Sequence, residues 1–343
     1  MVTYTIFNDA KYYSHCENEY NEVMSIPVKP AFAMMEGESI VPTLLPKEYS
    51  TVEEILKRID EIDLAIVEEI ARSKYLNSLQ IFEFLRLRGY SVKRDNLRRK
   101  ILKLMRYRII RENMIKCSGS ENGLRYYEIE LKGYLIALNK GVFFHAGNSF
   151  MTYKKKLETG KLDSPLDVKR VLAGNMIVSN ALKNGIKMER FGIMETFCVE
   201  NMDGKVKDGA IFRTAATIKI DDESVLAYEV VRDNEDGYIK LADKIERYYK
   251  LLHNEKYLYS NHHSDNVLPQ MVICGESEEH NKKIMEFLIE ENLWREEDTL
   301  LFTEDLLNIR DSAKSIYEFR NNEKIWYKLP QKNDINNGTK RTA

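Results

Sequence analysis

The stretch SVKRDNLRRKILKLMRY, residues 91–107, decides how the first half of the chain is expected to fold. Its apolar residues recur at steps of three and four, as one face of an amphipathic helix requires. These residues are Leu97, Ile101, Leu104 and Met105. Almost every position between them is basic. We therefore predict a helix from about Ser91 to Tyr107, with an apolar side in the core and a positively charged side facing outward.

Two further helices are predicted before this one. From Thr51 to Arg72, isoleucine and valine recur at helical steps. The next helix is predicted from Ser78 to Arg88, with Ser78 as its N-cap and Gly89 as its stop. The basic stretch is therefore the third helix of a set.

A β-hairpin is predicted directly after the third helix. The strand-like stretches Ile109–Ile115 and Leu124–Leu131 are joined by the turn-rich run CSGSENG at 117–123. Three helices followed by a hairpin give the order of a winged helix-turn-helix domain. Residues 132–144 are expected to close this domain with a helix or an extension.

The charge of the chain is distributed unevenly. The formal net charge is −2, which by itself argues against binding to nucleic acid. Between Arg86 and Arg111, however, eleven basic residues accompany one acidic residue, Asp95. In a winged helix the third helix enters the major groove, where its early residues reach base edges and its later residues reach phosphates. We therefore expect double-stranded DNA to bind here.

The predicted DNA contacts fall into two groups. Base readout is predicted for four residues early in the third helix: Arg94, Asn96, Arg98 and Arg99. Phosphate contacts are predicted for five residues in and beside that helix and on the hairpin, or wing: Lys93, Lys103, Arg108, Lys116 and Arg125. Four tyrosines are expected to pack in the core or the wing: Tyr107, Tyr126, Tyr127 and Tyr134. The alternative is a basic helix in a helical bundle that meets an acidic partner.

The length and composition are typical of a chain with two packed domains, since 343 residues with 43% hydrophobic content bury a sizeable core. Residues 1–50 hold four of the seven prolines and no sustained period, so we expect an irregular arm. The other predicted divisions are a winged helix-turn-helix domain over 51–147, a linker over 148–164, an α/β domain over 165–330 and a disordered tail over 331–343.

Several classes of protein are not expected from the same sequence. No apolar run approaches the ~18–20 residues that cross a bilayer, and the N-terminus lacks the order of a signal peptide. The four cysteines form no CxxC pair, and no GxxxxGKS, GxxxxGKT, GxGxxG or GxSxG motif occurs. His262 and His263 have no third ligand at metal spacing and are expected to be loop residues. We expect a cytoplasmic protein without a membrane partner and without a nucleotide or zinc cofactor.

The second half of the chain has a different order of predicted helices and strands. Its predicted elements are a helix over Leu166–Asn184, strands over Lys187–Val199, Ala210–Ile220 and Val225–Val231, a helix over Ile239–Leu252, a strand over Gln270–Cys274 and a helix over Glu279–Asn292. This α-β-β-β-α-β order, placed behind three helices and a hairpin, predicts an α+β chain whose second domain has a mixed central sheet.

Three segments of this half carry the residues with the most specific chemistry: Lys207–Ala210, Tyr228–Arg232 and Lys240–Tyr249. They resemble the restriction-endonuclease-like fold, whose signature is an Asp followed by Glu-x-Lys on the next strand. Two carboxylates on adjacent strands hold a divalent cation such as Mg²⁺, and the lysine orients or activates the attacking water. Asp208 and Glu229 match the two carboxylates, whereas Val231 occupies the position of the lysine.

Together with the winged helix, residues 60–255 resemble the replication-relaxation family of plasmid and mobile-element proteins. The shared pattern is an Asp-Gly segment, an acidic residue at a strand end followed closely by Arg, and a Lys-x-x-x-Tyr helix. These segments are Asp208-Gly209, Glu229 to Arg232, and Lys244 to Tyr248. The resemblance implies a role in plasmid replication, DNA relaxation or conjugative transfer. It also implies replication or relaxosome proteins, or a second copy of the chain, as partners.

Two interpretations of the second domain stay open. In one, Asp208 and Glu229 hold Mg²⁺ and Lys244 replaces the missing strand lysine, which gives an active DNA endonuclease. In the other, the domain keeps the fold without the chemistry, because Val231 removes a group that contributes orders of magnitude to the rate. We expect the inactive form. A transcriptional regulator whose C-terminal domain senses a ligand or dimerises is a further alternative.

Overall fold

The computed structural model describes residues 32–43, 48, 50–120, 122–142, 163–200, 206–252, 258–261, 267–294, 300–320 and 323–332. Side chains are described for these residues except at 198–200, 206–212, 251 and 258–261. The described residues thus exclude most of the predicted arm and linker, His262 and His263, and nearly all of the predicted tail. Among the described residues, no helix is both long enough and apolar enough to cross a membrane.

The described chain forms two compact units, each built around its own sheet or sheets. The first unit includes Met35–Leu172. The second begins at Ala173 and also includes the short segment Phe32–Met34. The division therefore lies inside helix α8, Pro165–Lys183, rather than in the predicted linker.

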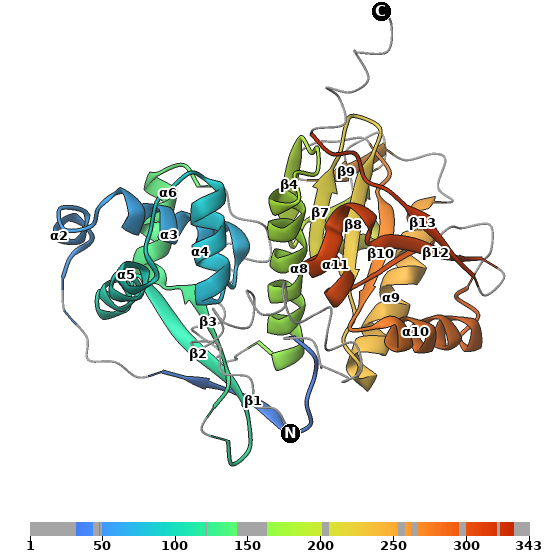
Figure 1. Ribbon diagram of the computed structural model, residues 1–343, viewed down its shortest axis with the longest axis horizontal. Coiled ribbons are helices and arrows are strands. Elements are labelled where there is room, and N and C mark those ends of the chain that lie inside the picture. Colours follow the sequence, from blue (N-terminus) through green and yellow to red (C-terminus); the bar gives the residue numbers. More distant parts are fainter. Residues whose placement is uncertain are drawn as a thin grey trace, which may run out of the picture. The chain divides into compact units, whose positions relative to one another are not determined.

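The first unit has five whole helices, the first part of α8 and one three-stranded sheet among its described residues (Figure 1). Its elements are β1 (Glu38–Pro42), α2 (Val52–Leu56), α3 (Glu61–Ser73), α4 (Ser78–Leu87), α5 (Arg94–Arg106), β2 (Ile110–Cys117), β3 (Leu124–Ile129) and α6 (Leu131–Asn139). The predicted third helix, the hairpin and the closing helix are thus present within a few residues of their expected bounds.

Capping side chains set the starts of the first three helices. The single helix predicted from Thr51 to Arg72 is wrong, because Asp60 caps a new helix and accepts the backbone N–H of Asp63 at 3.0 Å. Reciprocal bonds from the third residue back to the cap complete a capping box at α2, α3 and α4. The predicted cap of α4 is also wrong by one position, since Asn77 rather than Ser78 accepts the N–H of Gln80.

The N-terminal arm contributes a strand to the first unit. β1 pairs antiparallel with β2, so the sheet order is β1-β2-β3 and Ile40 lies opposite Ile115. The expectation of an irregular arm over 1–50 is therefore wrong for residues 38–42. The strand has no clear alternation of apolar and polar residues, because β1 is an edge strand whose residues are mostly half-buried or exposed.

The predicted apolar face of α5 is confirmed by its burial. Leu97, Ile101, Leu104 and Met105 are each at most 8% exposed. The four tyrosines predicted to pack in the core or wing are also at most 8% exposed, and Tyr126 packs edge to face on Tyr75. The hydrophobic period of the sequence therefore identifies the inward side of this helix.

A charged cluster joins the start of α3 to α5. The carboxylate of Asp63 is fully buried and accepts hydrogen bonds from Lys100 Nζ at 3.3 Å and Lys103 Nζ at 2.7 Å. Lys100, itself only 9% exposed, also donates to the cap residue Asp60. Burial opposes ionisation of Asp60, but the bonds from Lys100 and from the Asp63 backbone lower its pKa overall. Two of the basic residues of α5 therefore bond to the start of α3, Lys100 from a buried position and Lys103 from a half-buried one.

The second unit is built on a seven-stranded mixed sheet in the order β13-β12-β11-β10-β8-β7-β4. Its strands are β4 (Arg190–Ile193), β7 (Ala216–Lys219), β8 (Val225–Val230), β10 (Gln270–Gly275), β11 (Leu301–Glu304), β12 (Ile316–Arg320) and β13 (Glu323–Tyr327). The helices are α9 (Glu235–Leu252), α10 (Glu278–Glu290), α11 (Asp305–Asp311) and the 3₁₀ turn η2 (Ser312–Lys314), besides the second part of α8. Strands β8, β10 and β11 are mutually parallel, and the others pair antiparallel.

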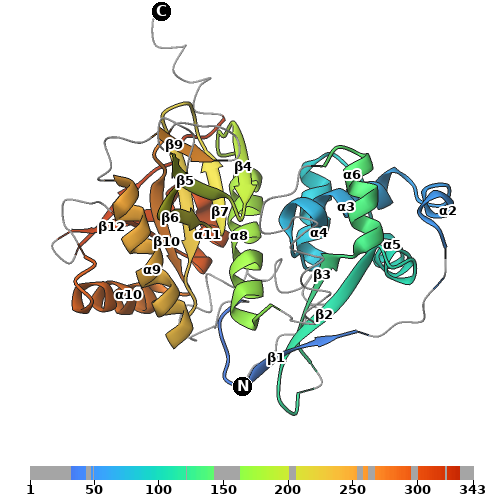
Figure 2. The same ribbon diagram turned by 180° about the vertical axis from the view of Figure 1, so that it is seen from behind.

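The two faces of this sheet are covered by different helices. Helices α9 and α10 lie on one face, and α8 and α11 lie on the other (Figures 1 and 2). The α9 face packs Leu241 and Ile245 of α9 and Ile284 of α10 against Ala227 and Ile273 of the sheet. On the other face, Gly174 of α8 lies so close to the backbone of Ala215 that a Cβ there would sit 2.7 Å from its oxygen. Prediction of an α+β chain with a mixed sheet is thereby confirmed.

The predicted strands over 187–199 and 210–220 are each divided between the seven-stranded sheet and a second, three-stranded sheet. It has the order β6-β5-β9 and consists of β5 (Thr196–Glu200), β6 (Val206–Arg213) and β9 (Leu258–Asn261). The predicted strand over 187–199 breaks at Met194, whose φ is 57°, and at Glu195, which is buried against Arg190 at 2.9 Å. Within the seven-stranded sheet and its helices the order is nevertheless α8, β4, β7, β8, α9 and β10.

We predict that Lys100→Ala lowers the free energy of unfolding by about 3 kcal/mol, because it leaves the buried Asp63 carboxylate short of a partner. Arg99→Ala, at the neighbouring exposed position, is the control and should change it by less than about 0.5 kcal/mol. Urea unfolding followed by circular dichroism measures both. Equal losses in the two variants would show that Lys100 contributes no more than a surface cation.

Candidate functional site

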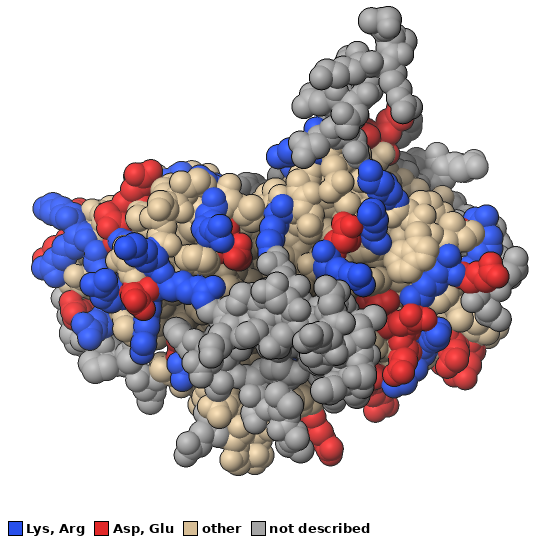
Figure 3. All heavy atoms as spheres, in the orientation of Figure 1, with Lys and Arg blue, Asp and Glu red and all other residues tan. Residues whose placement is uncertain are grey.

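The outward face of α5 is lined by arginine. Successive residues of an α-helix are about 100° apart, which places Leu97, Leu104 and Lys100 inward. Four arginines are exposed: Arg94 in the first turn, and Arg98, Arg99 and Arg106 on the side away from Leu104. Lys and Arg side chains gather over this part of the first unit in the space-filling view (Figure 3). Asp95 is the acidic residue among them.

A groove of about 450 Å³ runs beside this arginine face, between the start of α4, α5 and the hairpin. Arg94, Arg98 and Leu102 line it from α5, and Phe82 lines it from α4. Arg125 lines it from the hairpin strand β3. Three cations from two elements therefore converge on one concave surface.

The ring of Phe82 organises the mouth of the groove. The guanidinium of Arg94 lies 5.5 Å from the centre of this ring, and that of Arg86 lies 5.7 Å from it. Such stacking holds a guanidinium in place without neutralising it. Sequence reasoning missed Phe82, although its spacing of four residues from Arg86 is a signal for contact along one helix face.

The hairpin presents one side to the groove. Arg125 lies opposite Met114, and Tyr127 lies opposite Glu112. Because side chains alternate along a strand, Lys116 shares this side with Met114 and Glu112. The carboxylate of Glu112 accepts hydrogen bonds from Thr43 Oγ1 and from Tyr127 Oη, each at 2.9 Å. Its charge is thus held at the floor of the groove by two hydroxyls.

The ionisation of Tyr127 reflects its surroundings. Burial raises the pKa of this phenol, and the charge and hydrogen bond of Glu112 raise it further. The guanidinium groups of Arg125 and Arg98 act in the opposite direction. Tyr127 therefore remains a neutral donor, and both arginines lie near enough to influence it.

The other predicted DNA contacts lie away from this groove or beside it. Lys103 is bonded to Asp63 and to the carbonyl of Arg58 at 2.7 Å. Asn96 is half-buried and lies about 200° round the helix from Arg94. Two further predicted contacts are exposed at opposite ends of α5: Lys93 at its N-cap, and Arg108, which pairs with Glu130 at 3.4 Å.

The predicted nuclease acids are not on neighbouring strands. Glu229 lies on β8, whose neighbours are β7 and β10, and Asp208 lies on β6 in the other sheet. The expectation of adjacent strands is therefore wrong, because the stretch predicted as one strand divides between two sheets. The side chain of Asp208 lies outside the described residues.

Glu229 does meet the predicted lysine. Its side chain is 2% exposed and accepts a hydrogen bond from Lys244 Nζ of α9 at 2.5 Å. Val231, two residues further along the strand direction, is buried in the core against α9. Among the side chains that the structure describes, no group of three His, Cys, Asp or Glu residues is arranged to hold a metal ion.

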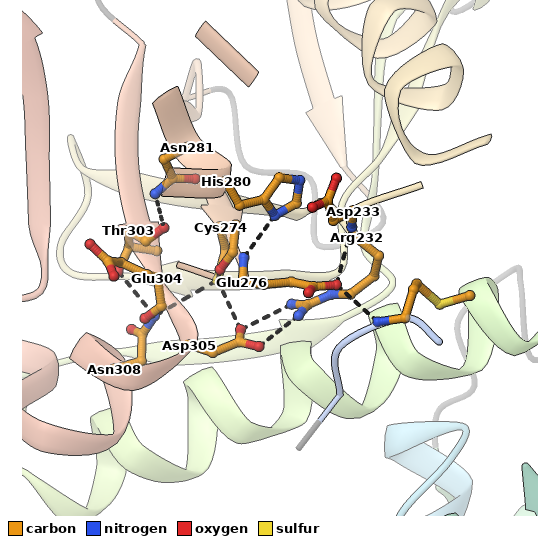
Figure 4. A network of polar contacts seen from close by, with 12 residues as sticks. Arg232, Asp233, Cys274, Glu276, His280, Asn281, Thr303, Glu304, Asp305 and Asn308 are labelled. Carbon is orange, nitrogen blue, oxygen red and sulfur yellow. Dashed lines mark hydrogen bonds and ion pairs between the residues drawn. The ribbon is translucent and has the colours of Figure 1, made fainter. Parts of the chain in front are cut away.

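A buried polar network occupies the carboxyl ends of the three parallel strands (Figure 4). Arg232, two residues after the end of β8, donates to both carboxylate oxygens of Asp305 at 2.6 and 3.0 Å. Both residues are at most 1% exposed. Burial alone would lower the pKa of Arg232, but Asp305 raises it above the usual value. This ion pair therefore joins the ends of two strands that lie on either side of β10.

Burial favours the uncharged forms of two other members of the network, Glu276 and Cys274. Burial raises the pKa of Glu276, whose carboxylate oxygen accepts the backbone N–H groups of Asp233 at 3.1 Å and Met34 at 3.0 Å. Burial and the neighbouring Asp305 also raise the pKa of the Cys274 thiol. Cys274 is thus a protonated, inert thiol and not a nucleophile.

His280 is the most perturbed base of the network. Its Nδ1 accepts the backbone N–H of Glu276 at 3.0 Å, so the neutral ring carries its proton on Nε2. That Nε2 is buried without a hydrogen-bond partner in the described part of the chain. Burial lowers the pKa of His280 to about 4.

Comparison of the chain with protein-family models, with curated proteins and with solved structures gives no match.

We predict that His280 makes the second unit less stable in acid. Its pKa is about 4 when folded and about 6.5 when unfolded, so the unfolded state binds the extra proton between these values. The stabilisation is complete above pH 6.5 and is lost as the pH falls toward 4, by at most roughly 3 kcal/mol. Because Glu276 contributes with the opposite sign, the difference between the parent and His280→Gln isolates the histidine. A difference in the free energy of unfolding between the parent and His280→Gln that does not change with pH in this range would contradict the prediction.

Proposed function

We propose that this protein binds double-stranded DNA in a sequence-specific manner through α5 and the β2–β3 hairpin. The observation that carries the proposal is the division of basic residues on α5. Lys100 and Lys103 form ion pairs with Asp63 of α3. The four arginines of α5 at 94, 98, 99 and 106 are exposed beside a groove that is also lined by Arg125. A helix of this kind fits the major groove of B-DNA.

The topology of the first unit supports a winged helix-turn-helix. Helices α3, α4 and α5 precede the hairpin, and Leu76, between α3 and α4, forms a short bridge with Tyr127 of β3. This bridge consists of two backbone bonds of 3.2 and 2.8 Å. It sets the hairpin against the helical layer, so the hairpin extends as a wing beside α5.

We assign the basic residues in and beside the groove to two kinds of DNA contact, with base edges and with phosphates. We propose that Arg94 and Arg98, near the start of α5, contact base edges, with Phe82 holding Arg94 in position. Arg125 and Lys116 of the wing would contact phosphates, which contributes affinity without sequence preference. Arg99 and Arg106 face the same solvent side and would add phosphate contacts.

For the second unit we propose a nuclease-like domain that has lost its chemistry. The order α8, β4, β7, β8, α9, β10 supports a core like that of restriction endonucleases. The ion pair between Glu229 and Lys244 and the buried Val231 favour an inactive site, because the acid is already neutralised and the strand lysine is missing. We further propose membership of the replication-relaxation family, with a cytoplasmic role in replication, DNA relaxation or transfer of a plasmid or mobile element. Replication or relaxosome proteins, or a second copy of the chain, would be its partners.

An active Mg²⁺-dependent endonuclease is the second candidate function. It is favoured by one observation, the position of Lys244 Nζ at 2.5 Å from Glu229, which brings a lysine to the acid as the missing strand residue would. In that case Asp208 and Glu229 would hold the cation and Lys244 would orient water.

Duplex binding by the full chain is predicted to weaken steeply with salt, because several phosphate contacts release counterions. Arg98→Ala should cost about 1–3 kcal/mol of binding free energy if it makes a bidentate base contact. Lys140→Ala, an exposed cation at the end of α6, is the control and should bind as the parent does. Fluorescence anisotropy with a labelled duplex measures this. An affinity that is insensitive to salt, or equal in Arg98→Ala and the parent, would exclude the α5 interface.

Plasmid cleavage separates the two candidate functions of the second unit. We expect no cleavage above background with Mg²⁺ or Mn²⁺, because Val231 replaces the strand lysine and Glu229 is paired. Cleavage that requires the metal and disappears in both Asp208→Ala and Glu229→Gln would instead establish the nuclease. Cooperative urea unfolding and circular dichroism like those of the parent would show that these two variants are folded.

A further inference from the structure

An acidic side chain lies among the arginines at the start of α5. Asp95 is exposed and lines the groove beside the hairpin together with Arg94 and Arg98. It belongs to the first turn of the helix, which is the part of a recognition helix that reaches base edges. A carboxylate in this position repels the phosphates that the arginines attract. A favourable contact of Asp95 with duplex DNA therefore requires a hydrogen-bond donor on a base.

The carboxylate of Asp95 has no partner within the described part of the chain, where it forms neither a hydrogen bond nor an ion pair. Arg99, four residues later, donates from Nε to the backbone carbonyl of Asp95 at 3.4 Å and not to its side chain. The other acid that lines the groove differs in this respect. Glu112 is 8% exposed, and its oxygens accept hydrogen bonds from Thr43 and Tyr127. Asp95 thus presents free acceptor oxygens at the surface of the groove.

Asp95 does not cap its helix. In α2, α3 and α4 a capping box closes the start of the helix, whereas α5 begins at Lys93 without a side-chain cap bond. Asp95 follows as the second residue of α5. Its remaining structural role is the favourable interaction of an acid with the positive end of the helix dipole. That interaction does not depend on the DNA sequence, so an experiment can separate it from a role in recognition.

The neighbours of Asp95 are suited to guanine. Arg98 lies three residues further along, about 60° round the helix axis, so the two side chains share one face of α5. Arg94 precedes Asp95, and its guanidinium lies 5.5 Å from the ring centre of Phe82. Arginine pairs with the O6 and N7 acceptors of guanine in the major groove. The carboxylate between these two arginines is suited to the opposite pattern, a base edge that offers a donor.

We infer that Asp95 determines specificity by accepting a hydrogen bond from the N4 amino group of a cytosine, beside the base pairs that Arg94 and Arg98 contact. The inference rests on the proposed binding of duplex DNA through α5 and adds the base that the site selects. Cytosine offers a donor in the major groove, whereas adenine places the acceptor N7 beside its donor. Guanine and thymine present acceptor oxygens, so the carboxylate also selects by repulsion.

The test selects tightly bound duplexes from a randomised library with the full-length parent, Asp95→Asn and Asp95→Ala. The parent should enrich a position at which cytosine is preferred. Asp95→Asn should change that preference to adenine, because an amide both donates to N7 and accepts from N6. Asp95→Ala should leave the position without a preference. A residue that acts only on the helix dipole would change none of these preferences.

Fluorescence anisotropy on the selected duplex then isolates the single contact. Replacing the cytosine by 2-pyrimidinone, which lacks the N4 amino group, should weaken binding of the parent about tenfold and of Asp95→Ala by less than about twofold. Asp95→Asn should also bind a duplex of unrelated sequence more tightly than the parent does, because a charge that repels phosphate is lost.

Glu53→Gln is the matched control, because Glu53 is an exposed acid in the first turn of α2 and does not line the groove. It should keep the affinity and base preference of the parent, and circular dichroism like that of the parent excludes unfolding of the Asp95 variants. The inference is overturned if the parent selects no cytosine, if Asp95→Asn selects the same bases as the parent, or if 2-pyrimidinone weakens the parent and Asp95→Ala equally. In those cases duplex binding that is lost in Arg98→Ala would still support the α5 interface. A parent that binds no duplex would contradict both.

Discussion

The buried carboxylate of Asp63 is the interaction on which the arrangement of the first unit depends. It closes the capping box of α3 and also accepts hydrogen bonds from Lys100 and Lys103 of α5. A charge with no exposure is costly unless its oxygens are fully bonded, so these partners are required and not optional. The requirement sets the rotation of α5 about its own axis.

That rotation decides what the helix offers to a partner. With Lys100 directed at α3, the arginines at 94, 98, 99 and 106 are directed outward, and the groove beside Phe82 and the wing forms on the same side. The buried apolar face, with Leu97, Ile101 and Leu104, already directs the basic side of α5 outward. The ion pairs with Asp63 add to this by keeping Lys100 and Lys103 at α3.

Buried ion pairs and hydrogen bonds also join elements of the second unit. The ion pair of Arg232 with Asp305 and the bonds to Glu276 join the ends of strands β8, β10 and β11. At an edge where many α/β proteins bind ligands, this unit has instead a buried network held by the ion pair of Arg232 with Asp305.

The sequence by itself determined the third helix, its apolar face, the hairpin and the mixed α+β character of the second half, because these depend on local periodicity and turn residues. Glu229 and Lys244 could also be singled out from the sequence as a pair. Only the tertiary structure decided that Lys103 is used internally, that residues 38–42 form a strand, and that Asp208 and Glu229 lie in different sheets. Each of these depends on contacts between residues far apart in the chain, and for such contacts a local pattern carries no signal. The pairing of β1 with β2 joins residues more than seventy positions apart, and its residues have no clear alternation of their own.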